Sequence, residues 1–536
     1  MSECGHDKRI LGCSHDTAGR RVCGGRRGDQ PGAAAVRKKD DPPPSDLDLL
    51  RKILSPTGAF IELFSWQGEG FASVPIGAGR QAFAVASRGF RAWVRREFLR
   101  EHKRHPSPHA LRTAINEIGD HAADEPEKRI FRRVGSDGKD WFIDLGNEAR
   151  DVIVISQGLW NHATRAPVHF ARSRAMRPFP KIRSQGAVNG NTNELDVACQ
   201  AKHREAFKAF KALLNLDTAD DFQLLMTWCV CALTPDGPYP VLTVCGDQGS
   251  AKSTLVRLTH ELVDPSSAPL RSLPSSEKDL FVSASNARLL AFDNVSRISA
   301  PMSDNLCKIS TGGVFAMRRA RTDADEVYLE FKAPVILNGI GDLILRPDLA
   351  DRALVINTTA FPEGGRRDTA SVNKAFSALA PRLTEALLDL LAFARRKFLS
   401  EEFGEWSPGP LPRMAEFAML GIAIEDLFGG PGSFMNAYDK NRQTAADELA
   451  ELDPILLTIL ELWDENKNCW SGTMQELQAE IARRLKASGS RLPVPTGLAQ
   501  ISSHVKRIKP ILIAKKINVA FHRAKTKDRR RTLHLF

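Results

Sequence analysis

One segment, residues 240–259, limits the possible folds of this chain more than any other. An apolar run from Pro240 to Cys245 leads into a glycine-rich turn of residues 246–254, and Leu255 to Thr259 follow with helical spacing. In this order, the backbone N–H groups of the turn face phosphates and the helix N-terminus adds partial positive charge. Apolar runs and helical segments alternate from Val241 to about Ile356, which predicts an α/β core with a parallel sheet. The alternative is a surface loop that has this pattern by chance.

The side chains of the turn suggest separate roles. Lys252 is expected to reach the β- and γ-phosphates of ATP, and Ser253 is expected to hold Mg²⁺. Ala251 stands where the usual pattern has glycine, and its methyl group fits if this residue keeps a negative φ. The expected cofactors are therefore ATP and Mg²⁺. The residues expected to bind them are Gly246, Gln248, Gly249, Ser250, Ala251, Lys252, Ser253 and Thr254.

A second apolar run, Arg288 to Phe292, ends in the acid Asp293. A carboxylate at the end of a strand suits the Mg²⁺ side of a P-loop site, so Asp293 is a candidate metal ligand beside Ser253. The next residue is Asn294, where many such ATPases carry a catalytic glutamate. The general base is therefore unassigned, and Asp304 is one candidate.

Two later residues complete the candidate catalytic set. Asn338 ends another apolar run and is expected to orient the attacking water or contact the γ-phosphate, unless it is an ordinary turn residue before Gly339. Arg352 precedes a further strand and could stabilise charge on the ATP of a neighbouring subunit. The alternative for Arg352 is a surface ion pair with Asp348, which would contribute little.

With these elements in order, the segment from about Pro240 to Ile356 resembles the superfamily 3 helicase branch of AAA+ ATPases, and most of all the helicase half of phage and plasmid primase-helicases. The resemblance implies that Lys252 and Ser253 form the Walker A pair and that Asp293 is the Walker B acid. It also implies that Asn338 is sensor 1 and that Arg352 is an arginine finger acting on a neighbouring subunit. A ring-shaped homo-oligomer, such as a hexamer, is then expected.

The same family carries a hairpin just before the strand that ends in the polar Asn, and its basic tip points into the pore of the ring. Residues 309–319 precede the strand-like run Glu326 to Phe331 and stand at the corresponding place. The resemblance therefore implies DNA contacts by Arg318, Arg319 and Arg321. It also implies that the chain replicates a phage or mobile element.

The last 85 or so residues are expected to form a small basic domain. Helices are predicted at residues 454–463, 474–487 and 498–508, and strands at 517–521 and 532–536, a pattern that resembles a winged helix. Residues 501–536 hold eleven lysines and arginines against one acid, Asp528. Such a surface fits a phosphate backbone, although a solvated charge run is the alternative. The candidate DNA contacts are Lys506, Arg507, Lys525, Lys527, Arg529, Arg530 and Arg531.

Composition agrees with a multidomain globular protein that binds a polyanion. The chain has 536 residues, 42% of them hydrophobic, and a formal net charge of +11, which favours nucleic acid or an anionic surface as partner. No apolar run approaches the roughly 18 residues of a membrane span, and the first residues lack the apolar core of a signal peptide. We therefore expect a cytoplasmic protein with DNA as partner and no membrane association.

Near the start, a loose cluster of possible zinc ligands matches no regular zinc site in its spacing, so a disordered tail is preferred to a zinc site. The residues are Cys4, His6, Cys13, His15 and Cys23.

Shifts in composition suggest six segments, and helical periodicity predicts helical structure from Lys202 to Leu233. The expected segments are a tail and linker (1–45), an N-terminal α/β accessory domain (46–184), a linker and helical lead-in (185–235), the P-loop ATPase core (236–400), a helical lid or connector (401–452) and the winged-helix-like domain (453–536).

Three functions agree with these patterns. The first is an ATP-dependent DNA helicase or translocase in the replication of a mobile element or phage. The second is a nucleotide-regulated DNA-binding or initiator protein with little ATP turnover, which the absence of a glutamate after Asp293 favours. The third is a signalling or defence ATPase whose C-terminal domain binds protein.

Overall fold

The computed structural model describes residues 43–55, 61–182, 197–216, 218–318, 326–339, 346–359, 367–399, 411–466, 468–487, 497–523 and 531–536. Contacts divide the chain into residues 1–45 and a larger unit, residues 46–536. The five residues of the considered zinc cluster, Cys4 to Cys23, lie outside the described ranges. Within those ranges, no group of three or more His, Cys, Asp or Glu side chains is placed to hold a metal ion.

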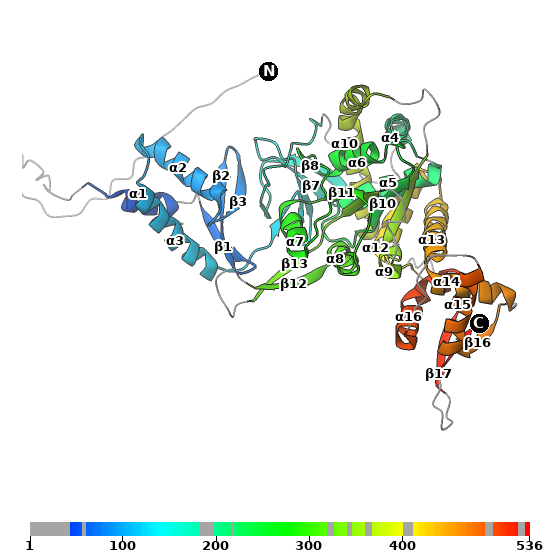
Figure 1. The fold of residues 1–536 in the computed structure, drawn as a ribbon. Helices are drawn as coiled ribbons and strands as arrows, with labels where there is room; N and C mark the ends of the chain where they lie inside the picture. Colours follow the sequence, from blue (N-terminus) through cyan, green and yellow to red (C-terminus); the bar gives the residue numbers. More distant parts are fainter. Residues whose placement is uncertain are drawn as a thin grey trace, which may run out of the picture. The chain divides into compact units, whose positions relative to one another are not determined.

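The larger unit contains a four-stranded parallel sheet (Figure 1). Its strand order, β11-β14-β10-β15, puts the strand before the glycine-rich turn in the interior of the sheet. All four strands are apolar runs, as expected for strands that helices cover on both faces. The strands are β10 (Val241–Gly246), β11 (Leu290–Val295), β14 (Val335–Gly339) and β15 (Ala353–Thr358).

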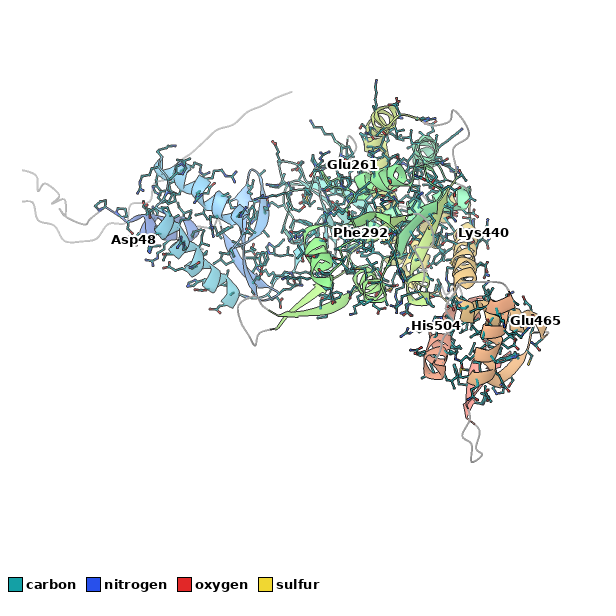
Figure 2. All side chains as sticks on the ribbon, in the orientation of Figure 1. Asp48, Glu261, Phe292, Lys440, Glu465 and His504 are labelled. Atoms are coloured by element: carbon teal, nitrogen blue, oxygen red, sulfur yellow. The ribbon has the colours of Figure 1, made fainter. Side chains whose placement is uncertain are left out.

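Alternate residues of β10, β11 and β14 enter two separate hydrophobic clusters. Leu242 and Ile336 pack on one face with α5 (Ala219–Ala232) and α6 (Lys252–Val263). On the other face lies Phe292, which is fully buried and labelled in Figure 2. The predicted parallel α/β core is therefore confirmed. Helices on this second side are α7 (Glu277–Asn286) and α8 (Ala300–Thr311).

Further helices surround the sheet. The helical region predicted from Lys202 to Leu233 consists of two helices, because the Thr218 side chain caps a new helix and forms a capping box with Asp221. The Thr218 hydroxyl accepts from the Asp221 N–H, and the Asp221 carboxylate accepts from the Thr218 N–H, so both backbone donors are satisfied at the start of the new helix. The remaining elements are α4 (Val197–Lys211), α9 (Pro347–Ala350), α10 (Thr369–Leu399), α12 (Ala415–Ile424), a short 3₁₀ turn (Glu425–Leu427) and α13 (Ser433–Leu452).

An antiparallel hairpin precedes β14. It pairs β12 (Gly313–Arg318) with β13 (Glu326–Phe331), from Gly313 opposite Phe331 to Arg318 opposite Glu326. A hairpin at this place was implied by the family resemblance, and the structure contains it.

The first described part of the larger unit is an α/β arrangement with two antiparallel sheets. A three-stranded sheet packs against the helices α2 and α3, and α1 packs against these two helices. A four-stranded sheet with the order β5-β6-β7-β8 follows. Ile143 and Trp160 of this second sheet belong to the same hydrophobic cluster as Leu242. The elements are α1 (Asp46–Leu54), β1 (Glu62–Trp66), β2 (Glu69–Ile76), β3 (Gly79–Ala84), α2 (Arg88–His102), α3 (Pro108–Asp124), β4 (Ile130–Phe131), β5 (Val134–Ser136), β6 (Trp141–Asp144), β7 (Val152–Ser156), β8 (Leu159–Ala163) and β9 (His169–Phe170).

The last elements are three helices and a three-stranded antiparallel sheet, drawn in orange and red in Figure 1. The helix predicted to end at Ile508 continues to Ala514, although Pro510 removes one backbone donor. Burial of Ile511 and Leu512 beyond this proline favours the longer helix. The elements are α14 (Pro454–Glu465), β16 (Trp470–Thr473), α15 (Met474–Ala487), α16 (Leu498–Ala514), β17 (Val519–Arg523) and β18 (Arg531–Leu535). Strand β16 was not predicted.

None of the helices in the described residues has the length and apolar character that crossing a membrane requires.

Candidate functional site

The glycine-rich turn leaves the carboxyl end of β10. In the parallel register Gly246 lies opposite Thr358, and Val244 lies opposite Asn338. The carboxyl ends of β10, β14 and β15 therefore meet at one edge of the sheet. In open α/β sheets, ligands bind outside this edge.

Gly246 is required by its surroundings. Its φ is 139°, and a Cβ on this residue would overlap the carbonyl and hydroxyl oxygens of Thr358. Gly249 has a φ of 82°, also in the region that favours glycine. The backbone of the turn can therefore lie close against the end of β15.

Two side chains outside the turn hold it in place. The Thr358 hydroxyl lies 2.7 Å from the hydroxyl of Ser250, which is fully buried. The Asn215 side-chain amide donates to the Ser250 carbonyl at 3.2 Å and also contacts the carbonyl of Thr359. Neither Asn215 nor Thr358 was predicted from the sequence. The available signal was weak, namely a polar residue after an apolar strand and an Asn between two helices.

Lys252 begins α6 and is 8% exposed. Its ammonium donates to the carbonyl oxygens of Gly246 at 2.8 Å and Asp247 at 2.6 Å, so it lies across the turn. Gln248 is exposed in the turn, and Thr254 follows Ser253 on the first turn of α6. The side chain of Lys252 is thus held beside the backbone groups expected to face phosphate.

Ala251 differs from the sequence prediction. A negative φ was expected to accommodate its methyl group, but the residue has φ 66° and ψ 24°, in the left-handed region. This conformation costs an L-residue about 1–2 kcal/mol relative to the right-handed one. The turn therefore requires the backbone that glycine adopts easily, and the chain places alanine there.

Ser253, Asp293 and Asn338 come together beside Lys252, although they lie on three elements. The Ser253 hydroxyl donates to Asp293 Oδ1 at 3.0 Å. The Asn338 amide donates to the Ser253 hydroxyl at 3.1 Å and also contacts Asp293 Oδ1. A hydroxyl and a carboxylate in contact provide the oxygen ligands that Mg²⁺ prefers.

Asn294 occupies a bulge that places Asp293. The β11–β14 register shifts between Phe292 and Val295, and Asn294 is exposed with φ 58°. Asparagine tolerates this left-handed conformation better than most residues. Asp304, considered as a general base, lies on α8 and forms an ion pair of 3.0 Å with Arg346.

Arg352 does not lie at the glycine-rich turn of its own chain. Its carbonyl accepts from the Val241 N–H at 2.8 Å, at the amino end of β10. The turn begins five residues further on, roughly 16 Å away at about 3.3 Å per strand residue. The Arg352 guanidinium donates to the backbone carbonyl of Asp348 at 2.7 Å, while the carboxylate of Asp348 lies 3.7 Å from Arg346. The considered Arg352–Asp348 ion pair is therefore not formed.

Among the candidate DNA contacts, the structure describes the side chains of Lys506 and Arg507. Lys506 and Arg507 are exposed on α16. Arg318 ends β12 and Arg531 begins β18, so the backbone places both at the ends of hairpin strands. Arg319, Arg321, Lys525, Lys527, Arg529 and Arg530 lie outside the described residues.

Cys229 and Cys231 are buried free thiols on α5. Burial raises the pKa of the Cys231 thiol to about 12. Such a thiol stays protonated, which excludes it as a nucleophile.

Two family models match the chain. Residues 208–460 match the model described as "Actinomycete integrative conjugative element replication protein", and residues 455–536 match the "AICE RepA C-terminal domain". The first match contains the glycine-rich turn, Asp293, Asn338 and Arg352. A comparison with curated proteins found no match.

Solved structures of the C-terminal region of NrS-1 in the apo form are also similar to this chain. One is 12% identical over 92% of this chain and 100% of that chain, with a TM-score of 0.36. A second is 13% identical over 91% and 98%, with a TM-score of 0.38. A third is 12% identical over 92% and 99%, with a TM-score of 0.37.

The two family models overlap at residues 455–460 and together span residues 208–536. This part of the chain is therefore similar to the replication proteins of actinomycete integrative conjugative elements.

Proposed function

We propose that the chain is an ATP-dependent DNA helicase or translocase that acts in the replication of a conjugative element. The observation that supports this most is the meeting of Lys252, Ser253, Asp293 and Asn338 at the carboxyl edge of the parallel sheet. A phosphate-binding turn, a magnesium-side carboxylate and a polar side chain beside them are the parts that P-loop hydrolysis of ATP needs.

The residues present fit ATP and Mg²⁺. Gly246 lets the turn lie against the end of β15, because a side chain there would overlap Thr358. Lys252 carries the charge that pairs with the β- and γ-phosphates. Ser253 and Asp293 would hold Mg²⁺, directly or through water. When bound, the metal neutralises charge on the phosphates. Asn338 would orient the attacking water, because its amide reaches the same two side chains.

Arg352 would act on ATP bound by a neighbouring subunit. Its position at the amino end of β15 keeps it away from the turn of its own chain. A ring-shaped homo-oligomer, such as a hexamer, would place it at the next site. An arginine supplied in this way stabilises charge that develops in phosphoryl transfer.

DNA would be bound at two places. The β12–β13 hairpin would present Arg318, Arg319 and Arg321 to DNA. The C-terminal elements run helix, strand, helix, helix, strand, strand, and this order supports a winged helix with α16 and the β17–β18 hairpin toward DNA. The exposed Lys506 and Arg507 on α16 suit the phosphate backbone.

The decisive experiment measures ATP hydrolysis by full-length protein with and without single-stranded DNA. Lys252→Ala is expected to abolish the activity, since it removes the charge that binds the transferred phosphate. Lys278→Ala, an exposed lysine on α7, is the matched control and should keep it. Hydrolysis by Lys252→Ala at the normal rate would refute the site.

A second function is favoured by one observation. The residue after Asp293 is an exposed Asn in a bulge rather than a glutamate, and Asp304 is paired with Arg346. A nucleotide-regulated DNA-binding or initiator protein with little turnover would fit this arrangement. Titration with ATP and Mg²⁺ in the presence of DNA separates the two functions. Tight ATP binding without release of phosphate would support the DNA-binding or initiator protein and contradict the helicase or translocase.

A further inference from the structure

The outward face of α2, in the part of the chain before both family models, is strongly basic. Residues 88–104 contain seven arginines and lysines and two glutamates. Arg88, Arg91, Arg95 and Arg96 are all exposed. The matched families begin at residue 208, so no comparison assigns a role to this helix.

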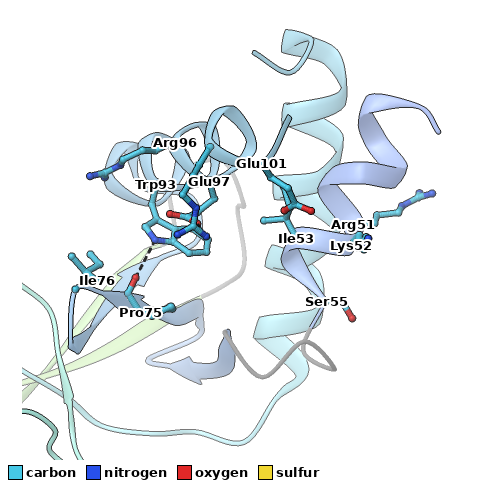
Figure 3. Close-up of a pocket in the computed structure, with 12 residues that line it drawn as sticks. Arg51, Lys52, Ile53, Ser55, Pro75, Ile76, Trp93, Arg96, Glu97 and Glu101 are labelled. Atoms are coloured by element: carbon cyan, nitrogen blue, oxygen red, sulfur yellow. Dashed lines mark hydrogen bonds and ion pairs between the residues drawn. The ribbon is translucent and has the colours of Figure 1, made fainter. Parts of the chain in front are cut away.

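The opposite face of α2 is fixed in the core of this part of the chain. Phe90, Trp93, Val94 and Phe98 are buried. The Trp93 indole N–H donates to the Pro75 carbonyl of β2 at 3.3 Å, as Figure 3 shows. Because the apolar residues are already packed, α2 has no free apolar face to insert into a lipid bilayer. The exposed arginines are therefore carried on a rigid support.

The charges of this face are not neutralised within the described residues. The ion pairs of this segment are Arg100 with Glu97 and Arg104 with Asp46. None of the described carboxylates lies within ion-pair distance of Arg88, Arg91, Arg95 or Arg96.

The spacing of three of these arginines suits a linear polyanion. Arg88, Arg91 and Arg95 are three and four residues apart, so they lie on one side of the helix. They span about 10 Å of helix axis at 1.5 Å per residue. Duplex DNA carries one charge per about 1.7 Å of its axis, so several phosphates lie within that length. Guanidinium groups bind phosphate oxygens through paired hydrogen bonds.

We propose that the exposed arginine face of α2 binds the phosphate backbone of DNA, independently of ATP. It would give the chain a DNA contact separate from the β12–β13 hairpin and the C-terminal domain. Since the contact is to the backbone, it would hold DNA without reading its sequence.

A hollow of about 920 Å³ beside α2 borders this surface at Arg96 but does not include Arg88, Arg91 or Arg95. Glu97 and Glu101 line it together with Arg51, Lys52, Arg96 and Arg100, some of which Figure 3 labels. The two carboxylates would repel phosphate, and Arg51 and Arg100 are already paired with acids. The proposal is therefore limited to the outer face.

The test measures DNA affinity of the full chain without nucleotide, over a series of salt concentrations. The variant combines Arg88→Gln, Arg91→Gln and Arg95→Gln, in a background of Lys506→Gln and Arg507→Gln that weakens the C-terminal contact. The matched control combines Lys278→Gln, Lys374→Gln and Arg382→Gln in the same background. These three residues are exposed and lie outside α2.

A plot of log affinity against log salt concentration should become less steep by about 2–3 when three phosphate contacts are lost. Binding at 0.15 M salt should weaken on the order of 100-fold. The control should change neither. Equal affinity and equal slope for the two variants would overturn the proposal. So would normal DNA binding by the α2 variant together with lost binding to vesicles of anionic lipid.

An unchanged midpoint of thermal unfolding would show that the exposed substitutions leave the fold intact. A variant with lysine in place of Arg88, Arg91 and Arg95 should recover most of the DNA affinity. The ATPase result with Lys252→Ala is independent of these measurements. Failure of one proposal therefore does not imply failure of the other.

Discussion

The side chain of Asn338 donates a hydrogen bond of 3.1 Å to the hydroxyl of Ser253, a residue 85 positions earlier in the chain. Asn338 ends β14 and Ser253 lies on the first turn of α6. Both contact Asp293 of β11, so three elements converge on one carboxylate. This small network is the basis of the first prediction.

Asn338→Ala is expected to lower kcat for ATP hydrolysis by about 10²–10³-fold, the usual loss when one positioned donor is removed from a reacting centre. The Kd for ATP should change little, because the turn and Lys252 remain. Steady-state hydrolysis and nucleotide titration measure the two quantities. Asn286→Ala, at an exposed helix end, is the control. Normal kcat in the Asn338 variant would remove this residue from the mechanism.

Ala251→Gly is expected to stabilise the protein by about 1 kcal/mol, because glycine adopts a φ of 66° without the cost that alanine bears. Unfolding in urea gives the change in free energy. The matched substitution Ala92→Gly, at an exposed position inside α2, should have the opposite sign and destabilise by roughly 0.5–1 kcal/mol. Destabilisation by both substitutions would contradict the left-handed conformation of Ala251.

Thr358→Val keeps the shape of the side chain and removes the hydroxyl that lies against Ser250 and donates to the Cys245 carbonyl at 3.0 Å. Only the contact with Ser250 holds the glycine-rich turn, and one hydrogen bond contributes about 0.5–1.5 kcal/mol net, so ATP affinity should fall about 2- to 10-fold as the turn loosens. Isothermal titration with ATP and Mg²⁺ measures this. Thr358→Ser retains the hydroxyl and should bind ATP as the unmodified chain does. If the serine and valine variants weaken binding equally, the hydroxyl contact is not the cause.

Arg133→Met is expected to cost about 3–5 kcal/mol of stability. Arg133 is fully buried and donates to the Asp264 carboxylate at 2.8 Å, so its removal leaves a buried charge without its partner. Chemical unfolding measures the loss. Arg51→Met breaks an exposed ion pair with Glu117 and should cost less than about 1 kcal/mol. Adding Asp264→Leu to Arg133→Met should recover part of the loss, and no recovery would argue against this explanation.

Arg352→Ala is expected to reduce hydrolysis by about 10³-fold while leaving ATP binding intact, if it acts on a neighbouring subunit. Mixing it with Lys252→Ala protein should restore part of the activity, because some interfaces then combine an intact turn with an intact arginine. Activity of the mixture measures this, with each variant alone as the reference. A mixture as inactive as its components would exclude action between subunits.

Local sequence patterns were enough to predict most elements of the core. The apolar runs before Gly246, Asp293 and Asn338 all form buried parallel strands, because a run without polar interruption suits a sheet covered on both faces. Strand β16 was missed because Trp470 to Thr473 is short and contains a glycine. The helix break before Thr218 was missed because the flanking residues keep a helical period on both sides.

The sequence by itself determined the strands, the glycine-rich turn and the types of side chain at the strand ends, since these depend on neighbours in the chain. Only the tertiary structure decided that Asn338 reaches Ser253 and that Thr358 and Asn215 hold the turn. It also decided that Arg352 lies at the amino ends of the strands, away from the turn, and that Ala251 has a left-handed backbone conformation. These relationships depend on the strand order β11-β14-β10-β15 and its register, which bring together residues that are far apart in the chain.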